Sequence, residues 1–390
     1  MASPLRPHFV IEERYQKKPG SYRTLLTDEV LADISSRLTG DPYFTVTFEP
    51  QINVGRLAML YYRGKSFFVS VSEVEVQSRN SSFQSFPSAL SRYILANGEK
   101  EICYYVHPAI RGNFATGYFM FMYRLMKTAG VNLMNVTEHV AQPILPFAAP
   151  EDVIATKDAL RTKKASNNST YVTRGSDGAT EVYGKTYGAS KYETTLICLA
   201  LAQIANAGLR LYQIEEGGLK VLPKQSRLAI HAWGGTIEAS TTAFETVEFR
   251  ERNSLRSIRF AYNLLEKFQK KRCAFCACAI PQIVQGAHVW PVAAIKQSGL
   301  PFKEQLDHAL NGHNGLWLCE NHHKLLDSAT LYLHTSGRLL YRHSLGANDT
   351  QFIRQTTTTV ALPPAVLHPR FLDYLARRNS TLSAQNYAAI

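Results

Sequence analysis

The sequence lacks any long hydrophobic run. Its longest apolar stretch, around 196–201, is far shorter than the ~20 residues that a membrane-spanning helix needs. Its first 14 residues contain no apolar core of the signal-peptide kind. Both absences predict a soluble, cytoplasmic protein with no membrane partner.

Cysteine is also scarce, because six cysteines in 390 residues are too few for a disulfide scaffold. Cys103 and Cys198 stand alone inside apolar runs, where a cysteine usually serves as a small core residue. The other four gather towards the C-terminus beside several histidines, a grouping typical of a metal site. These four are Cys273, Cys276, Cys278 and Cys319.

Acidic residues are outnumbered, with 31 Asp and Glu against 43 Lys and Arg, which gives a net charge of +12. Hydrophobic residues make up 45% and charged residues 19%, which are ordinary globular values that exclude wholesale disorder. The positive field favours a polyanion, because each neutralised phosphate releases condensed counterions. Charge alone leaves two interpretations open, a nucleic-acid-binding protein and a merely basic soluble one.

No internal repeat is evident, and the segment around Gly184 and Lys185 lacks the spacing of a phosphate-binding P-loop. Hydrophobic periodicity predicts mixed strands and helices along the chain. The expected helices lie at about 27–38, 88–96, 116–129 and 189–207, and the expected strands at 44–48, 56–62, 66–76 and 209–214. We therefore expect three regions: an α+β DNA-recognition region (1–146), a linker plus second α+β unit of the same body (147–245), and a C-terminal domain (246–390).

A basic helix is expected at 250–272, directly before the cysteine cluster. Residues 246–272 contain 8 basic and 3 acidic residues, a net charge of +5. The ordinary interpretation of such a run is a solvated helix face, and the alternative is contact with the DNA backbone, which the following motifs favour. The expected DNA-binding residues are Arg252, Arg256, Arg259, Lys270 and Lys271.

Two ligand pairs bracket a histidine-rich segment. Cys273 and Cys276 form a C-x2-C pair, and Cys319 and His322 form a C-x2-H pair. Zinc prefers four N or S ligands in a tetrahedron, commonly supplied as two such pairs. We therefore expect one structural Zn²⁺ per chain, although Cys278 offers a competing C-x-C with Cys276.

Between and around these pairs stand Gly286-Ala287-His288-Val289-Trp290-Pro291 and Asn314-Gly315-Leu316-Trp317-Leu318-Cys319-Glu320-Asn321-His322-His323. With these motifs, residues 250–330 resemble the HNH, or ββα-metal, endonuclease family, and most closely its McrA-like and type II restriction members. The resemblance implies an α+β fold class, with an N-terminal mixed α+β recognition body followed by a zinc-stabilised ββα-metal nuclease domain.

The resemblance also implies the catalytic residues. His288 would be the general base, and Asn314 would brace the hairpin, with Asn311 as the alternative. His323 would bind a catalytic Mg²⁺, for which Mn²⁺ can substitute, with Asn314 as a possible second ligand. Many members have Asp directly before the first His, where this chain has Ala287.

Two roles remain open for Asp327, and two for the group of Glu181, Glu193 and Glu215. Asp327 is either an acid that orients His323 or a surface acid. Glu181, Glu193 and Glu215 suggest a second carboxylate site, but their spacing favours a structural turn and helix cap.

The predicted function is a sequence-specific, type II-like restriction endonuclease that hydrolyses phosphodiester bonds in double-stranded DNA. A palindromic target would require a homodimer. The alternatives are a modification-dependent HNH endonuclease and, from another class, a non-catalytic zinc-containing DNA-binding protein. The presence of His288, Asn314 and His323 argues against the last, because a zinc scaffold needs no second set of such residues.

Overall fold

The computed structural model describes residues 6–13, 27–50, 57–72, 86–106, 117–134, 144–160, 170–185, 190–215, 222–253, 255 and 257–390. The described chain is of the α+β class, as predicted. It divides into two compact units. The N-terminal unit comprises Met1–Val172 and Thr180–Glu238, and the C-terminal unit comprises Thr173–Ala179 and Ala239–Ile390.

A six-stranded sheet forms the first half of the N-terminal unit, in the order β2-β1-β3-β4-β5-β6. Strands β4, β5 and β6 are parallel, whereas β3 pairs antiparallel with both β1 and β4. The strands are β1 (His8–Glu13), β2 (Thr45–Pro50), β3 (Leu57–Tyr62), β4 (Lys65–Ser72), β5 (Lys100–Val106) and β6 (Asn132–Met134).

Both faces of this sheet are covered because its strands alternate apolar residues on the two sides. Phe67 and Val69 face α1 (Asp28–Thr39), which is capped by Thr27 and ends at Gly40 with a φ of 76°. Phe68, on the other face, belongs to the core shared with α2 (Phe86–Leu95) and α3 (Gly117–Thr128).

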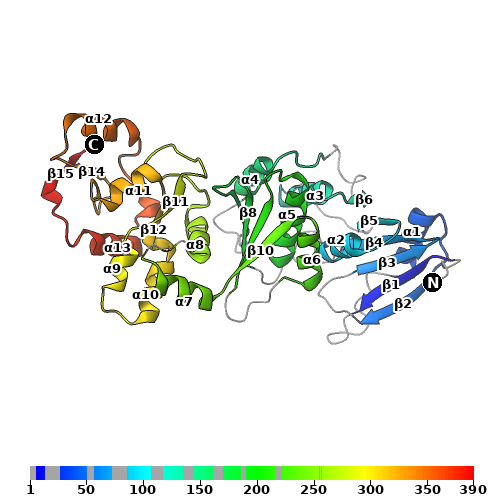
Figure 1. Ribbon diagram of the computed structural model, residues 1–390. Helices are drawn as coiled ribbons and strands as arrows, with labels where there is room; N and C mark the ends of the chain where they lie inside the picture. Colours follow the sequence, from blue (N-terminus) through cyan, green and yellow to red (C-terminus); the bar gives the residue numbers. More distant parts are fainter. Residues whose placement is uncertain are drawn as a thin grey trace. The chain divides into compact units, whose positions relative to one another are not determined.

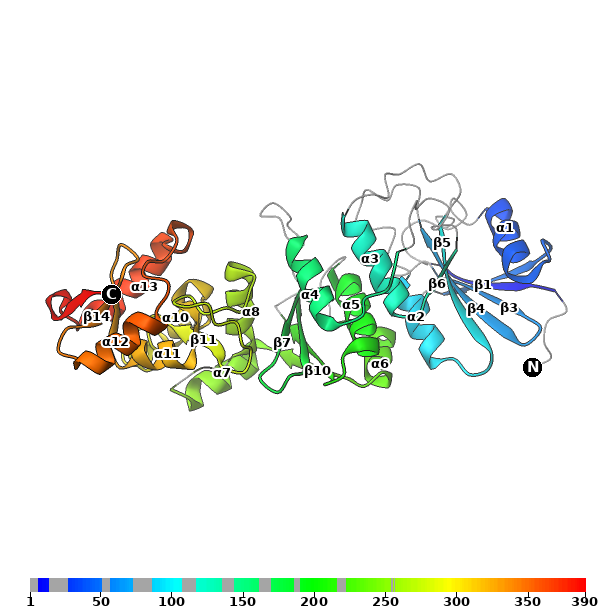
Figure 2. The same cartoon turned by 90° about the horizontal axis from the view of Figure 1, so that it is seen from above.

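A four-stranded sheet forms the second half, in the order β10-β9-β8-β7. Its strands are β7 (Thr170–Arg174), β8 (Thr180–Lys185), β9 (Leu209–Ile214) and β10 (Gly235–Ser240), and the accompanying helices are α4 (Pro150–Ala159), α5 (Ser190–Ile204) and α6 (Lys224–Ala232). Helices α2 and α3 pack against α5 and α6, so the helices lie between the two sheets (Figures 1 and 2).

The two halves repeat one order of elements, although the sequence shows no repeat. In the first half the strands β3-β4-β5-β6 are neighbours, with α2 after β4 and α3 after β5. In the second half the strands β7-β8-β9-β10 are neighbours, with α5 after β8 and α6 after β9. The resemblance between the halves is therefore one of topology.

The C-terminal unit is built around a hairpin of β11 (Val284–His288) and β12 (Gly315–Cys319), followed by α11 (Glu320–Asp327). A three-stranded sheet in the order β13-β14-β15 follows it. The remaining elements are α7 (Thr242–Glu251), α8 (Ile258–Phe268), α9 (Val292–Lys296), α10 (Phe302–Leu310), η2 (Gly312–Asn314), β13 (Leu331–Leu333), β14 (Leu339–Arg342), α12 (Ala347–Thr356), η3 (Pro364–Val366), α13 (Pro369–Asn379), η4 (Ala384–Asn386) and β15 (Tyr387–Ala389).

The prediction of one basic helix over 250–272 is wrong, because two helices occupy this region. Helix α7 ends where Arg252 becomes extended, with φ −116° and ψ 137°. Helix α8 begins anew after Ser257, whose hydroxyl accepts a hydrogen bond from the N–H of Phe260. It ends at Gln269, which has a φ of 63°. The cap at Ser257 competes with a continuous helix, and the periodicity of the side chains did not reveal it.

Candidate active site and metal centre

Four predicted metal ligands come together in the C-terminal unit. The ligand atoms of Cys273, Cys276, Cys319 and His322 all lie within 4.8 Å of one another. The Nδ1 atom of His322 is 3.5 Å from the sulfur of Cys273 and 3.1 Å from that of Cys319, and the sulfurs of Cys276 and Cys319 are 3.9 Å apart. Zinc bond lengths imply edges of about 3.5 to 3.8 Å in a tetrahedron, so this donor set fits zinc.

The surroundings of the cluster fix its donors. The second nitrogen of His322, Nε2, lies 3.1 Å from the hydroxyl of the buried Thr357, which leaves Nδ1 to face the sulfurs. Burial raises the pKa of Cys273 to about 12, so zinc binding must displace a proton from this thiol. The side chain of Cys278 is outside the cluster. Its backbone carbonyl supports the turn that holds Cys273, by accepting a hydrogen bond from the N–H of that residue.

The hairpin places His288 at the end of β11, opposite Gly315 of β12. Its imidazole stacks on the ring of Phe260 from α8, with centroids 3.9 Å apart and planes 8° apart. Its Nε2 lies 2.9 Å from the carbonyl oxygen of Ala309. A carbonyl only accepts, so Nε2 carries the proton and Nδ1 is the free basic nitrogen of the neutral ring.

Burial lowers the pKa of His288 to about 4, although the Ala309 carbonyl opposes the shift. The positive charge of His323 is a further, smaller cause. The imidazole is therefore neutral at pH 7, as a general base must be.

Asn314 is fully buried and lies at the end of η2. Its side-chain oxygen accepts a hydrogen bond from the backbone N–H of Trp290 at 2.7 Å. Its amide nitrogen donates to the carbonyl oxygens of Trp290 (3.1 Å) and His308 (3.2 Å). These bonds tie the segment after His288 to the segment before β12.

His288 and His323 line the same pocket, which has a volume of about 550 Å³. The Nε2 atom of His323 is 3.3 Å from a carboxylate oxygen of Asp327, which also lines the pocket. Ala287 does not line it and is only 1% exposed, so that strand position contributes no polar group. Glu320, at the start of α11, adds a second carboxylate to the lining.

The three arginines expected to contact DNA differ in their surroundings. Arg252 is exposed and forms an ion pair with Glu248 at 3.1 Å. Arg259 is half-buried, and its backbone N–H donates to the carboxylate of Glu245. Arg256 lies outside the described residues.

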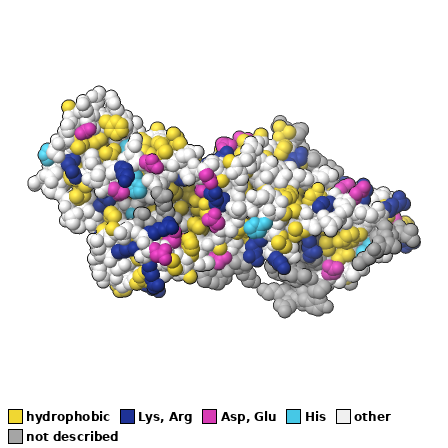
Figure 3. All heavy atoms as spheres, viewed as in Figure 1, with side chains coloured by type: hydrophobic (Ala, Val, Ile, Leu, Met, Phe, Trp, Pro, Cys, Tyr) yellow, Lys and Arg dark blue, Asp and Glu magenta, His cyan; other side chains and the backbone are white. Residues whose placement is uncertain are grey.

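The two lysines differ in a similar way. Lys270 is exposed, whereas Lys271 donates to the carbonyl of Pro281 and lies 5.8 Å from the ring centroid of Trp317. On the face drawn in Figure 3, Lys and Arg side chains form separate groups interspersed with acidic ones. The described residues of this face therefore form no single basic stripe.

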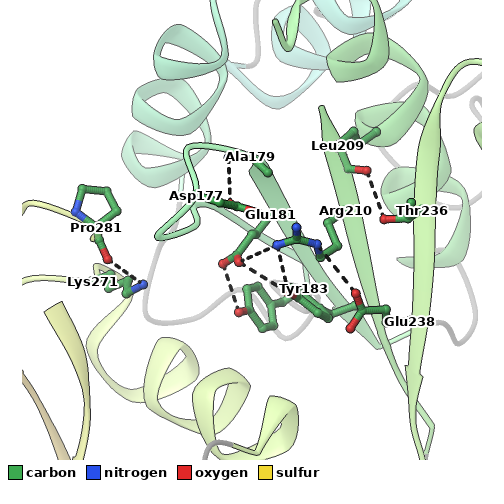
Figure 4. Close-up of polar contacts among 11 residues, drawn as sticks. Asp177, Ala179, Glu181, Tyr183, Leu209, Arg210, Thr236, Glu238, Lys271 and Pro281 are labelled. Carbon is green, nitrogen blue, oxygen red and sulfur yellow. Dashed lines mark hydrogen bonds and ion pairs between the residues drawn. The ribbon is translucent and has the colours of Figure 1, made fainter. Parts of the chain in front are cut away.

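The acids Glu181, Glu193 and Glu215 are engaged in separate contacts. Glu181 accepts from Tyr183 at 3.1 Å and lies 3.5 Å from Arg210, which also approaches Glu238 (Figure 4). Glu193 forms a buried ion pair with Lys157, and Glu215 accepts from Gln213. Residues 186–189 of the same segment lie outside the described residues.

Comparison with known proteins identifies the segment that carries this geometry. Residues 273–334 match the HNH endonuclease family. This segment includes the four residues that could hold zinc, the β11–β12 hairpin with α11, and the pocket histidines. The chain contains an HNH endonuclease domain. This domain indicates nuclease activity and, with it, DNA as a binding partner. No curated protein matches the chain, and no helix among the described residues is long and apolar enough to cross a membrane.

The sequence did not indicate several residues around the HNH site. Phe260 lies 28 positions before His288, and Thr357 lies 35 positions after His322, so neither contact belongs to a local motif. Glu320 is different, because it stands inside the Cys-x2-His pair and its place at the start of α11 was open to prediction.

Proposed function

We propose that the chain is a site-specific, type II-like DNA endonuclease whose HNH domain cuts double-stranded DNA. The observation that carries the proposal is the pairing of a neutral, buried His288 with His323 in one pocket. A structural zinc finger has no need for a buried histidine with a free Nδ1, so the pocket supports catalysis over the non-catalytic alternative.

In this proposal Nδ1 of His288 accepts the proton of the attacking water. Phe260 and the Ala309 carbonyl hold the ring, and Asn314 braces the connection behind it. Because Asn314 is fully buried and does not line the pocket, we assign it this bracing role alone.

His323 is the residue that would hold the divalent cation, with water and phosphate completing its shell. A bound Mg²⁺ stabilises the negative charge that develops on the leaving oxygen. Asp327 acts on His323 and is a positioning residue, because its carboxylate lies against Nε2 of that imidazole. The zinc ligands Cys273, Cys276, Cys319 and His322 hold the hairpin and α11 together.

The test is cleavage of supercoiled plasmid with Mg²⁺ by the wild-type chain and by His288→Gln, on unmodified and methylated DNA. We expect discrete fragments from the wild type and a rate that is about 10²–10⁴-fold lower for the variant. Zinc content and DNA binding should be unchanged in the variant, because His288 ligates no zinc.

The outcomes separate the alternatives. Cleavage of methylated DNA only would indicate a modification-dependent enzyme. Tight DNA binding without cleavage in Mg²⁺ or Mn²⁺ would indicate the non-catalytic class. Near wild-type cleavage by His288→Gln would remove His288 from the mechanism.

A further inference from the structure

A second group of basic side chains lies in the C-terminal unit, outside the pocket. It comprises Lys267 of α8, His313 of η2, and His368 and Arg370 at the start of α13. We call these four residues the α13 cluster. The rings of His313 and His368 stack with centroids 4.3 Å apart and planes 28° apart. Lys267, His368 and Arg370 are all close enough to act electrostatically on His313.

Two polar atoms of the α13 cluster are buried without a hydrogen-bond partner among the described residues. They are Nζ of Lys267 and Nδ1 of His313. The ammonium of Lys267 rests between the rings of Phe268 and Phe371, at 4.8 and 4.7 Å from their centroids. Aromatic faces attract a cation but do not accept the strong hydrogen bonds that an ammonium can donate.

No described acidic residue acts on His313 to balance this positive charge. Among the described residues, the charges that act on His313 are all positive. Burial alone lowers the pKa of Lys267 to about 8, so the lysine is still mostly protonated at pH 7. Buried cations are normally paired, and no described carboxylate forms an ion pair or hydrogen bond with the ammonium of Lys267.

The outer part of the α13 cluster is accessible and presents donors. His368 and Arg370 are exposed. Nδ1 of His368 accepts the backbone N–H of Arg370, so its proton lies on Nε2 and is available for donation. The cluster also lies at the first turn of α13, an 11-residue helix whose dipole favours an anion at that end.

We propose that the α13 cluster binds a backbone phosphate of the DNA strand, at a position away from the scissile phosphate. The inference rests on the proposed function, which supplies the DNA. Arg370 and His368 contact the phosphate directly, and Lys267 supplies further positive charge beneath them. Burial and the neighbouring cations lower the pKa of His313 to about 4, so its ring packs against His368 as a neutral group. His313 directly precedes Asn314, so the segment that braces the catalytic hairpin also carries this contact.

The test measures binding of the full-length protein to a 20-base-pair duplex in EDTA, by fluorescence anisotropy over a range of salt concentrations. The variants are Arg370→Gln and Lys267→Met, and the matched control is Lys303→Gln, which removes an exposed charge from α10 of the same unit. We expect each cluster variant to bind more weakly and to reduce the slope of log K against log salt, by ~0.9 per lost contact. The control should keep the wild-type slope.

A wild-type slope in Arg370→Gln would overturn the inference. If Lys267→Met fails to fold, Arg370→Gln alone still tests the inference, because Arg370 is exposed. As a second readout, the Lys267 side-chain signals should shift in NMR spectra when the duplex is added. A shift with inorganic phosphate alone and none with the duplex would mean that the cluster takes a free anion and not a strand.

The failures of this inference and of the proposed function are distinguishable. If the wild type cuts DNA and the cluster variants keep their salt slopes, only the phosphate contact is wrong. If the wild type binds DNA with the expected slopes but cuts none, only the nuclease proposal fails.

Discussion

His288 illustrates how its surroundings set the chemistry of one residue. Its ring is held by Phe260 on one face and by the Ala309 carbonyl at Nε2, so Nδ1 keeps one orientation. A free histidine would be partly protonated below pH 7, and a protonated imidazole accepts no further proton. The buried ring avoids that loss, because its pKa is lowered to about 4.

This shift predicts the acid limb of the pH–rate profile. His288 acts in its neutral form, so kcat/KM should persist at pH 5 and decline as the pH falls through about 4. The measurement is single-turnover cleavage between pH 3.5 and 8 at constant ionic strength. An acid limb centred near 6.5 would show that the ring titrates as if exposed.

The same shift affects stability in a defined direction. The ordinary pKa of 6.5 applies to the unfolded chain, and the folded pKa is depressed. The folded state thus binds fewer protons between pH 4 and 6.5. This contribution to stability is fully present above pH 6.5 and declines as the pH falls towards 4.

At the scale of elements, α8 lies so close to the catalytic hairpin that glycines are required there. A Cβ on Gly315 would lie 2.6 Å from a ring carbon of Phe260, and one on Gly286 would lie 2.8 Å from a methyl group of Leu264. Both contacts are closer than real Cβ atoms tolerate. The position of α8, and with it the stack on His288, therefore depends on these two residues.

We predict that Gly315→Ala destabilises the protein by about 1–3 kcal/mol, the usual cost of overpacking. It should also reduce cleavage, because Phe260 would have to move from His288. The control is Gly346→Ala, where the added methyl group would meet only Asp349, at 3.8 Å. Urea unfolding of both variants checks this; equal midpoints would contradict the close packing of α8.

The cluster of Cys273, Cys276, Cys319 and His322 joins elements that are far apart in the chain, the turn at 273–276 and the start of α11. We predict that Cys319→Ser loses the bound zinc and unfolds at lower temperature, because zinc binding is coupled to folding. Cys278→Ser is the matched control, since Cys278 is outside the cluster. This variant should keep one zinc per chain. Native mass spectrometry and thermal unfolding measure both effects, and zinc retained by Cys319→Ser would refute the ligand set.

At the scale of the whole molecule, most of the chain lies outside the segment that matches the HNH family. The N-terminal unit has two sheets and a shared helical core, and its acids Glu181, Glu193 and Glu215 are held in separate contacts. We therefore propose that this unit reads the target sequence and that the HNH domain supplies the cut.

This division of labour predicts where bases contact the protein. The cleavage site is synthesised with 5-iodouracil in place of single bases and bound to the full-length chain. Photo-crosslinks from these bases should map to peptides before residue 239. Phosphate contacts carry no sequence information, so crosslinks through bases report recognition directly. Base crosslinks found only in residues 239–390 would place recognition in the C-terminal unit. Sedimentation of the same complex would show whether two chains bind one palindromic site.

The sequence by itself indicated the HNH segment and its cluster of three cysteines and a histidine. The grouping of the four residues that could hold zinc was predictable, because their spacing in two pairs reflects a local turn and the first turn of a helix. The α1 helix and the β9 strand were also predictable, since the Thr27 cap and the alternation over 209–214 are local signals.

Only the tertiary structure decided the features that depend on long-range contacts. Strand β1 was not among the expected strands, yet it pairs with β2 and β3 inside the six-stranded sheet. The break between α7 and α8, the lowered pKa of His288 and the approach of Lys267 to the start of α13 have the same origin. Burial and electrostatic surroundings depend on which segments pack together, and residues distant in the sequence carry no local signal of that packing.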